Sequence, residues 1–228
     1  MNSLYVIATP IGNLEDISIR ALNVLRSVEL IAAEDTRITL RLLKHYNIDT
    51  KLISYHEHSK RSKVTKLVNI LRDTDLALVC DSGTPVISDP GRELVKLAQE
   101  EGFNVVPIPG PSSIIAGVSV SGLDTTKFLF VGFLPRKSSE RIKLFKESFP
   151  SSNALVFLES PRRLRASLTD LKNSLGDRKL TICREMTKVY EEIFVGTATT
   201  ALEHFEEPRG EFTVIIEGGV ENGSSDLN

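Results

Sequence analysis

Short apolar runs alternate with amphipathic segments along the first half of the chain. Residues 4–8 form a continuous apolar run that ends before Pro10 and Gly12, which is typical of a buried strand. Residues 17–28 instead carry apolar side chains at helical spacing, with Asp16 as the expected N-cap. This rhythm predicts a mainly parallel sheet with helices on both faces. The further predicted strands are 30–33, 51–54, 76–80 and 103–106, and the helices are 38–46, 64–72 and 92–101.

The pattern changes after residues 107–123, a stretch rich in proline, glycine and serine that contains a predicted short helix at 112–118. The later predicted strands lie closer together, which favours a mixed sheet in a second α/β domain. We therefore expect domains at 1–114 and 115–219, followed by a flexible tail at 220–228. The predicted strands are 128–132, 154–158, 181–185, 192–195 and 212–217, and the helices are 140–148, 162–174 and 198–206.

Composition narrows the class of protein. Cys80 and Cys183 are the two cysteines of the 228 residues, so neither a disulfide framework nor a cysteine-based zinc site is plausible. The amino-terminal segment lacks the pattern of a signal peptide, and no apolar stretch approaches the ~20 residues of a membrane span. These features predict a soluble cytoplasmic protein. Because Cys80 ends an apolar run, we expect it to be a core residue.

Charge is segregated along a chain whose net charge is only −2. Residues 136–188 contain 13 Lys and Arg against 6 Asp and Glu, and residues 37–66 contain 8 against 2. Residues 189–228 are acidic, with nine acidic residues and one basic residue. Such segregation permits a basic face that binds an anionic partner, but the charge counts by themselves favour solvated helix faces.

Three loops rich in glycine and proline follow directly after predicted strands, at residues 9–14, 81–91 and 107–113. Ligands of open α/β sheets bind outside the carboxyl ends of the strands, so loops at equivalent ends converge on one pocket. Each loop by itself is better explained as a turn, but the turn is a weak explanation for all three together. None matches a nucleotide-binding fingerprint, which disfavours a phosphate cofactor. The set favours a ligand held by backbone groups and a few polar side chains.

His56 and His58 flank Glu57 and share one face of an extended segment. A metal site needs further ligands at suitable spacing, and the sequence offers none. We therefore predict no metal here, and contact with RNA or with a second subunit instead.

The three loops, TPIGN, DSGTPVISDPG and PIPGPSS, resemble those of the tetrapyrrole (corrin/porphyrin) methylase superfamily. Its members bind S-adenosylmethionine between two α/β domains. Further segments resemble one branch of it, whose members methylate the ribose 2′-hydroxyl of cytidine 1402 in bacterial 16S rRNA. The likeness runs from residue 4 to about residue 217. These segments are AEDTR at 33–37, SYHEH at 54–58, FLPR at 133–136, ESPRR at 159–163 and REMTK at 184–188.

The resemblance implies a set of cofactor-binding residues. The first loop would line the pocket, the second would form its main wall, a small polar pair would begin the linking helix, and two residues of the second domain would close over the adenosine. A sulfonium cation needs carbonyl or carboxylate oxygens nearby, which these loops offer. The residues are Pro10, Gly12, Asp81, Gly83, Thr84, Pro85, Ile87, Ser112, Ser113, Leu158 and Glu159.

Methyl transfer to a ribose hydroxyl requires an in-line approach, removal of a proton and cations that hold the RNA backbone. Asp35 and Glu34 are candidate bases, and Lys188 is a third if burial lowers its pKa. Water is an alternative acceptor of the proton, and residues 34–36 are equally compatible with a helix cap. Residues 159–162 are likewise compatible with a simple helix start. The candidate RNA-binding residues are Arg37, His56, Arg136, Arg162, Arg163 and Arg184.

The branch also implies partners. We expect a homodimer that acts on 16S rRNA within the 30S subunit. Two other functions stay open from the sequence: methylation of a porphyrin or corrin precursor, and a ribosome-binding module without catalysis.

Overall fold

The computed structural model describes residues 2–148 and 153–219. By their contacts the residues form two compact units, Met1–Ser112 and a second that begins at Ser113. The boundary predicted after residue 114 lies next to this division, and the predicted tail at 220–228 lies outside the described residues. Within the described part of the chain, no helix is long and apolar enough to span a membrane.

The first unit contains a five-stranded sheet with the order β3-β2-β4-β1-β5. Every pairing in it is parallel, so all carboxyl ends of the strands meet at one edge. The parallel sheet predicted from the alternating pattern is confirmed. The strands are β1 (Ser3–Ile7), β2 (Leu30–Ala33), β3 (Lys51–Ser54), β4 (Leu76–Val79) and β5 (Asn104–Ile108).

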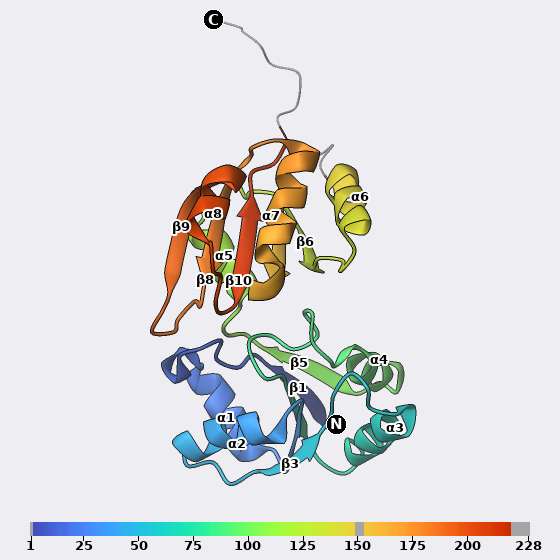
Figure 1. Cartoon of the computed structure of the whole chain (residues 1–228). Coiled ribbons are helices and arrows are strands. Elements are labelled where there is room, and N and C mark those ends of the chain that lie inside the picture. The colour runs from blue at the N-terminus through green and yellow to red at the C-terminus, as the bar shows by residue number, and fades with distance from the viewer. Residues whose placement is uncertain (1, 149–152, 220–228) are drawn as a thin grey trace, which may run out of the picture. The chain divides into compact units, whose positions relative to one another are not determined.

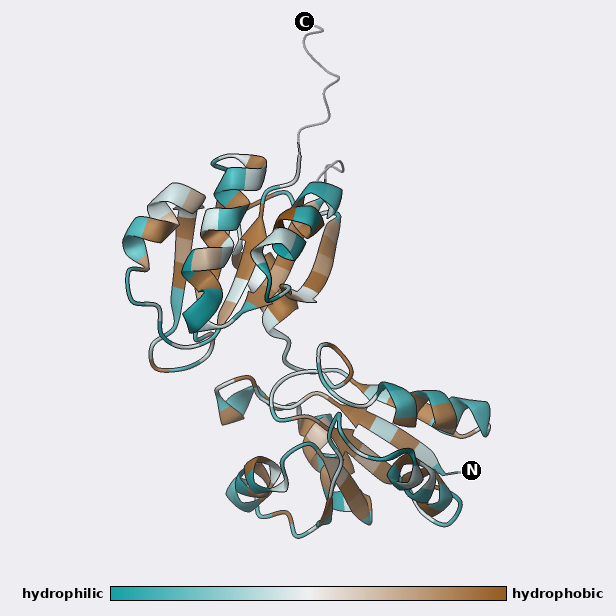
Figure 2. Ribbon diagram, turned by 45° about the vertical axis from the view of Figure 1, so that its right-hand side comes forward, coloured by the Kyte–Doolittle hydropathy of each residue, from teal (hydrophilic) through white to brown (hydrophobic). Residues whose placement is uncertain are grey.

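Helices cover both faces of this sheet, as predicted. Helices α1 (Ile19–Ser27) and α2 (Thr36–His45) bury their apolar side chains on one face. Helices α3 (Arg61–Ile70) and α4 (Arg92–Glu100) do so on the other face (Figure 1). The strands are brown along most of their length in Figure 2, whereas the helices are brown on one side and teal on the other. This contrast explains the two sequence patterns, because a strand between two helical layers is buried on both faces.

The predicted N-cap of the first helix is wrong. Asp16 lies in a short 3₁₀ turn, η1 (Leu14–Asp16), and α1 begins after Ser18. The Ser18 hydroxyl accepts a hydrogen bond from the Ala21 N–H at 3.0 Å. An N-cap residue has an extended backbone and lies directly before the first helical residue, so that its side-chain oxygen reaches an N–H of the first turn. Ser18 lies directly before Ile19 and is extended, whereas Asp16 lies two residues too early.

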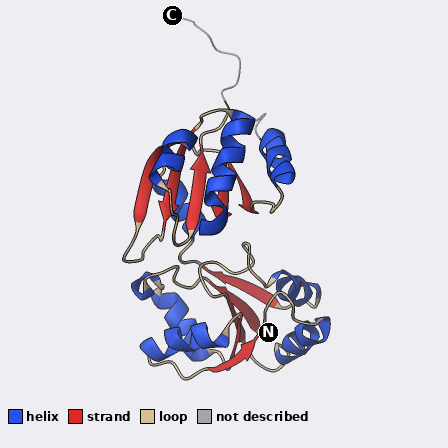
Figure 3. Ribbon diagram, viewed as in Figure 1, coloured by secondary structure: helices blue, strands red, loops and turns tan. Residues whose placement is uncertain are grey.

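The second unit contains a mixed five-stranded sheet with the order β6-β7-β10-β8-β9, as predicted. Strands β6 and β7 are parallel, whereas β10 is antiparallel to both β7 and β8. Figure 3 shows these strands with their helices in the upper part of the view. The strands are β6 (Phe128–Phe133), β7 (Ala154–Glu159), β8 (Lys179–Arg184), β9 (Glu192–Thr197) and β10 (Phe212–Ile216). The helices are α5 (Ser113–Val120), α6 (Ser138–Ser148), α7 (Pro161–Leu175) and α8 (Ala198–His204).

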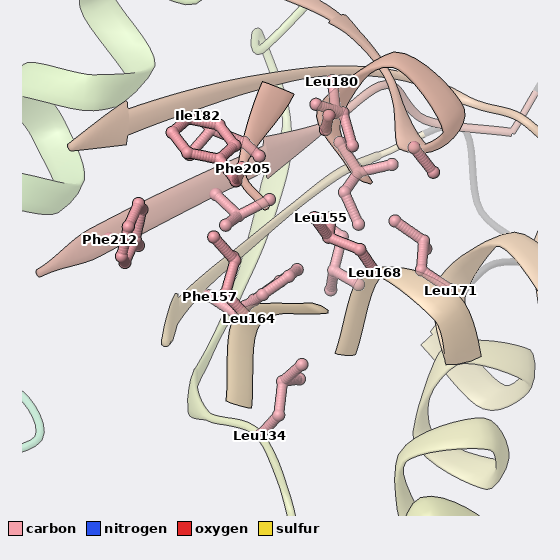
Figure 4. Close-up of a cluster of buried hydrophobic side chains, with 14 of the residues drawn as sticks. Leu134, Leu155, Phe157, Leu164, Leu168, Leu171, Leu180, Ile182, Phe205 and Phe212 are labelled. Carbon is pink, nitrogen blue, oxygen red and sulfur yellow. The ribbon is translucent and has the colours of Figure 1, made fainter. Parts of the chain in front are cut away.

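The core of the second unit lies between the sheet and helices α6, α7 and α8. Phe157 on β7 and Leu164 on α7 are fully buried there (Figure 4). Helix α5 packs on the opposite face of the sheet. A Cβ atom at Gly117 of α5 would lie 3.2 Å from the Ile215 side chain, so glycine permits this close packing.

A buried ion pair joins α6 to α7. The guanidinium of Arg141 lies 2.6 Å from the carboxylate of Asp170, and both side chains are almost inaccessible to solvent. Asp170 also accepts a hydrogen bond from the Ser138 hydroxyl at 2.8 Å. Arg141 donates to the carbonyl oxygens of Pro135 and Arg136. The pair therefore holds the segment between β6 and α6 to the helical layer.

Candidate active site

The carboxyl-terminal edge of the parallel sheet carries most of the candidate residues of the first unit. His56 follows β3, Glu34 follows β2, Asp81 follows β4, Pro10 follows β1 and Gly110 follows β5. The strand order places the ends of β2, β4 and β1 next to one another in the centre of this edge. Sequence-distant loops thus meet where open α/β sheets bind their ligands.

Direct hydrogen bonds join the three loops rich in glycine and proline. The N–H of Thr9 donates to the Gly83 carbonyl at 2.8 Å, and the Gly83 N–H donates back to the Thr9 carbonyl at 3.1 Å. The hydroxyl of Thr84 donates to the Pro111 carbonyl at 3.2 Å. Gly110 lies so close to Ala8 that a Cβ atom would be 3.0 Å from the Ala8 Cβ. The predicted convergence of the loops is confirmed within this unit.

The loop after β4 has an unusual backbone. Val86 and Ser88 have positive φ angles, and so do Gly83 and Gly91. A Cβ atom at Gly91 would lie 2.9 Å from the side chains of Leu78 and Val86, so only glycine fits there. Backbone conformations of this kind store strain and are concentrated at functional sites.

The cofactor-binding residues expected in the first unit lie along this edge. Asp81 accepts a hydrogen bond from the Asp35 N–H at 2.8 Å, which joins the loop after β4 to the loop after β2. Ile87 is 46% exposed although it is apolar, so this edge carries an accessible hydrophobic side chain. Gly83 and Pro85 are buried, whereas the other expected residues of this unit are at least partly accessible: Pro10, Gly12, Asp81, Thr84 and Ser112.

Asp35 is the N-cap of α2, and its carboxylate accepts a hydrogen bond from the Arg37 N–H at 2.8 Å. The helix-cap interpretation is therefore confirmed. Hydrogen bonds from the Arg37 side chain and backbone also lower the pKa of Asp35 to about 2. A carboxylate with so low a pKa is a weak base at neutral pH.

Glu34 has the opposite environment. The residue is half-buried, and this burial raises its pKa above the ordinary value, with the charges of Asp81 and Glu57 acting in the same direction. The Asp81 N–H lies 3.4 Å from the Glu34 carboxylate. General base catalysis is most efficient when the pKa of the base lies near the operating pH. Of the three candidate bases, Glu34 is the one whose pKa is shifted towards neutral pH.

Lys188 does not meet the condition under which the sequence made it a candidate base. Burial opposes its charge, but hydrogen bonds to Glu211 and Glu185 outweigh this effect and raise the pKa of Lys188. The ammonium lies 2.9 Å from Glu211 and 3.0 Å from Glu185. Lys188 therefore remains protonated at neutral pH and cannot accept a proton there.

Asp89 is a residue that sequence reasoning missed. It is half-buried, and this burial, together with the charges of Glu34 and Asp81, raises its pKa to about 6. The Cys80 thiol, which donates to the carbonyl oxygens of Ser82 and Gly83 at 3.4 Å, partly offsets this rise in the pKa of Asp89. Cys80 is buried as predicted, and burial raises the pKa of its thiol to about 12. The signal for Asp89 in the sequence was that the loop after β4 contains it as a second aspartate besides Asp81.

The Asp89 carboxylate is expected to cost the protein stability. Its pKa of about 6 lies above the ordinary value of 3.8, so the folded protein binds the proton more tightly than the unfolded chain does. The cost of ionisation therefore grows as the pH rises from about 4 to above 6. Because the side chain is only half-buried, solvent screening reduces this cost to about 1 kcal/mol.

We therefore expect Asp89→Asn to increase the free energy of unfolding by about 1 kcal/mol at pH 8 and to change it little at pH 4. Urea denaturation at the two pH values measures the difference. Equal effects at both values would contradict this explanation of the raised pKa.

In the second unit, Glu159 begins the segment that leads into α7. Its side chain is fully buried, where it accepts hydrogen bonds from the Ser160 N–H, from Arg163 at 2.7 Å and from the Ser167 hydroxyl at 2.6 Å. The carboxylate thus stabilises a helix start, with Pro161 in the first turn. Leu158 is partly accessible, but the Glu159 side chain, expected to close over a cofactor, is not available to one.

Some of the candidate RNA-binding residues form ion pairs within the protein and others do not. Arg163 is paired with Glu159, and Arg184 lies 3.1 Å from Glu192. Arg37 is paired with Asp35, although its side chain is 86% exposed. His56, Arg136 and Arg162 are exposed, and their side chains form no ion pair with another described residue. In the described ranges, no group of three or more metal-ligating side chains comes together.

Comparison with known proteins agrees with this arrangement. The family of tetrapyrrole (corrin/porphyrin) methylases matches residues 3–202. A ribosomal RNA small subunit methyltransferase I from Halalkalibacterium halodurans is 47% identical over 96% of this chain and 77% of its own. The protein of that name from Thermotoga maritima is 45% identical over 96% of this chain and 99% of its own.

Solved structures show the same fold at low sequence identity. Diphthine synthase superposes with a TM-score of 0.72 at 12% identity, covering 96% of this chain and 90% of that one. Cobalt precorrin-4 methyltransferase superposes with a TM-score of 0.67 at 15% identity, covering 95% of this chain and 94% of that one. The chain belongs to the tetrapyrrole (corrin/porphyrin) methylases and, within them, to the family of the ribosomal RNA small subunit methyltransferases I.

Proposed function

We propose that this protein transfers a methyl group from S-adenosylmethionine to the ribose 2′-hydroxyl of cytidine 1402 in bacterial 16S rRNA, within the 30S subunit. The observation that carries the proposal is the 47% identity to a ribosomal RNA small subunit methyltransferase I over 96% of the chain. The branch-specific segments found in the sequence favour this substrate over a porphyrin or corrin precursor.

The loops at the edge of the parallel sheet suit S-adenosylmethionine. They present backbone groups around Gly83, an exposed apolar side chain at Ile87 and carboxylates at Asp81 and Glu34. Carbonyl and carboxylate oxygens stabilise a sulfonium cation, and an apolar surface suits adenine. Pro10, Gly12, Thr84, Pro85, Ser112, Ser113 and Leu158 complete the proposed set. When bound, this cofactor supplies the methyl group.

Glu34 takes the proton from the ribose 2′-hydroxyl in this proposal. An alkyl hydroxyl is barely ionised at neutral pH, so a base increases its nucleophilicity as the new O–C bond forms. The neighbouring charges of Asp81 and Glu57 favour the protonated form of Glu34. Arg37, Arg136 and Arg162 are exposed and are suited to contact phosphates, because a guanidinium binds phosphate oxygens in pairs.

The reaction is tested with methyl-labelled S-adenosylmethionine and three acceptors: 30S subunits from a strain without this gene, naked 16S rRNA and a tetrapyrrole precursor. We expect label in the 30S RNA, mapped to a ribose 2′-oxygen. Label in the tetrapyrrole instead would replace the proposed substrate. Binding of the cofactor and of the 30S subunit without transfer would support a non-catalytic module.

We also propose that the protein forms a homodimer through the β9 edge of the second unit. Strand β9 is at the end of its sheet, so its outer backbone groups are free to pair with a second copy. Its Val195 side chain is 65% exposed, and in the preceding turn Val189 and Tyr190 are 94% and 72% exposed. An apolar edge strand pairs with itself about a two-fold axis, which closes the assembly at two chains.

Val195→Lys is expected to shift the dimer to a monomer, because it puts two like charges into an apolar interface. Light scattering distinguishes the monomer of 25.2 kDa from a species of twice that mass. Leu129→Lys is the matched control, since Leu129 is an exposed apolar residue on β6, at the opposite end of the same sheet. Dissociation by the control variant alone would place the interface at β6.

A further inference from the structure

A cavity of about 370 Å³ lies within the first unit, between the segment that follows β3 and the loop that leads into α4. Its lining includes the polar residues His56, Glu57, Ser59, Ser88, Asp89, Arg92 and Glu93. Ligand pockets measure about 300–1,000 Å³, so this cavity is suited to one small molecule or one nucleotide. In the loop after β4, the residues proposed above for the cofactor end at Ile87, and the cavity lining continues from Ser88.

Asp89 gives the cavity its chemical character. The charges that act most on this carboxylate, those of Glu34 and Asp81, are both negative, and the thiol that also acts on it, that of Cys80, is a weak donor. Among the residues that the structure describes, no N–H donor forms a hydrogen bond or ion pair with this half-buried carboxylate. It is therefore an acceptor suited to a donor that a ligand brings, such as an amino group.

The other walls match the remaining parts of a nucleotide. His56 presents an exposed imidazole, and histidine is one of the side chains on which unstacked RNA bases stack. Arg92 is exposed and provides a guanidinium for a phosphate. Ser88 adds a hydroxyl at the rim, in a left-handed backbone conformation with φ of 62°. A stacking ring, a cation and three carboxylates therefore surround one space. Glu57 and Glu93 are exposed, and Asp89 is the carboxylate that is half-buried.

We infer that this cavity holds the base of the target cytidine, and that Asp89 accepts a hydrogen bond from the cytosine N4 amino group. This inference rests on the proposed function. Carboxylates accept from cytosine N4, whereas uracil presents an O4 acceptor at the same position and is repelled. An enzyme that modifies a base-paired or stacked nucleotide reads the extruded base by such contacts. Asp89 is thus a specificity-determining residue.

Asp89→Asn tests the inference. An amide presents both a donor and an acceptor, so it accommodates cytosine and uracil alike. The substrates are 30S subunits with cytidine or with uridine at position 1402, prepared from cells that lack this gene. We measure kcat/KM for methyl transfer to each. Asp49→Asn is the matched control, because Asp49 is an exposed aspartate of the same unit that lies outside the cavity.

The wild-type protein is expected to prefer cytidine over uridine, and Asp89→Asn to reduce this preference on the order of 10-fold. The control is expected to keep the wild-type ratio. Unchanged affinity for S-adenosylmethionine shows that the variant is folded. An unchanged ratio in Asp89→Asn overturns the inference and leaves the proposed function intact. Absence of methyl transfer to either subunit by the wild-type protein overturns the proposed function itself.

Discussion

Glu34→Gln is expected to lower kcat for methyl transfer roughly 100-fold, because general base catalysis contributes about 10²- to 10⁴-fold. Glutamine keeps the size of the side chain and its hydrogen-bonding oxygen but does not accept a proton. The bond from the Asp81 N–H therefore has an acceptor in the variant as well. Affinity for S-adenosylmethionine is expected to change much less than kcat, since the lost group acts on the hydroxyl.

The pH profile gives an independent readout. Glu34 has to be ionised to act as a base, and its pKa is raised above the ordinary value of 4.5. Wild-type activity is therefore expected to decrease as the pH falls, with a midpoint above 4.5. The residual activity of Glu34→Gln should lack this dependence. Glu29→Gln is the matched control, because Glu29 is exposed and precedes the same strand that Glu34 follows. An unchanged kcat in Glu34→Gln would contradict the role of Glu34 and indicate that water accepts the proton.

Asp170→Ala is expected to lower the free energy of unfolding by about 3–5 kcal/mol, because it leaves a buried charge without its partner. Arg141 is 5% exposed, and its guanidinium lies 2.6 Å from the Asp170 carboxylate. The Ser138 hydroxyl loses its acceptor in the same variant. Urea denaturation of wild type and variant measures the difference.

Two comparisons separate the buried charge from other causes. Replacing both partners, with Arg141→Met and Asp170→Leu, is expected to restore much of the stability, since no unpaired charge remains. Lys143→Ala removes an exposed partner of Glu147 on α6 and is expected to cost no more than about 0.5 kcal/mol. A double variant as unstable as Asp170→Ala would show that packing, not charge, dominates at this position.

Much of the fold was predictable because apolar runs and helical spacing report burial directly. Strands β2 and β3 begin and end at the predicted residues. Strand β5 extends two residues past its predicted end at 106, through Pro107 to Ile108. Proline normally ends a strand, but β5 is at the edge of its sheet, where a missing donor is tolerated.

The candidate site was predictable in its location but not in the chemistry of each group. The position of the loops follows from the strands before them, so their convergence could be expected from the sequence. The sequence offered Glu34 and Asp35 at this edge as candidate bases, and Lys188 of the second unit on the condition that burial lowers its pKa; the structure separates the three. Arg37 lowers the pKa of Asp35, Glu211 and Glu185 raise that of Lys188, and burial raises that of Glu34.

The sequence by itself determined the parallel and mixed sheets, the family and the edge at which the candidate residues gather, because these depend on local patterns and on motifs. The tertiary structure alone decided which side chains are accessible. It turned Glu159 inward to Arg163 and Ser167 and placed Asp89 beside Glu34 and Asp81. Burial and charge from distant segments set the pKa and availability of a group, and no local pattern in the chain encodes them.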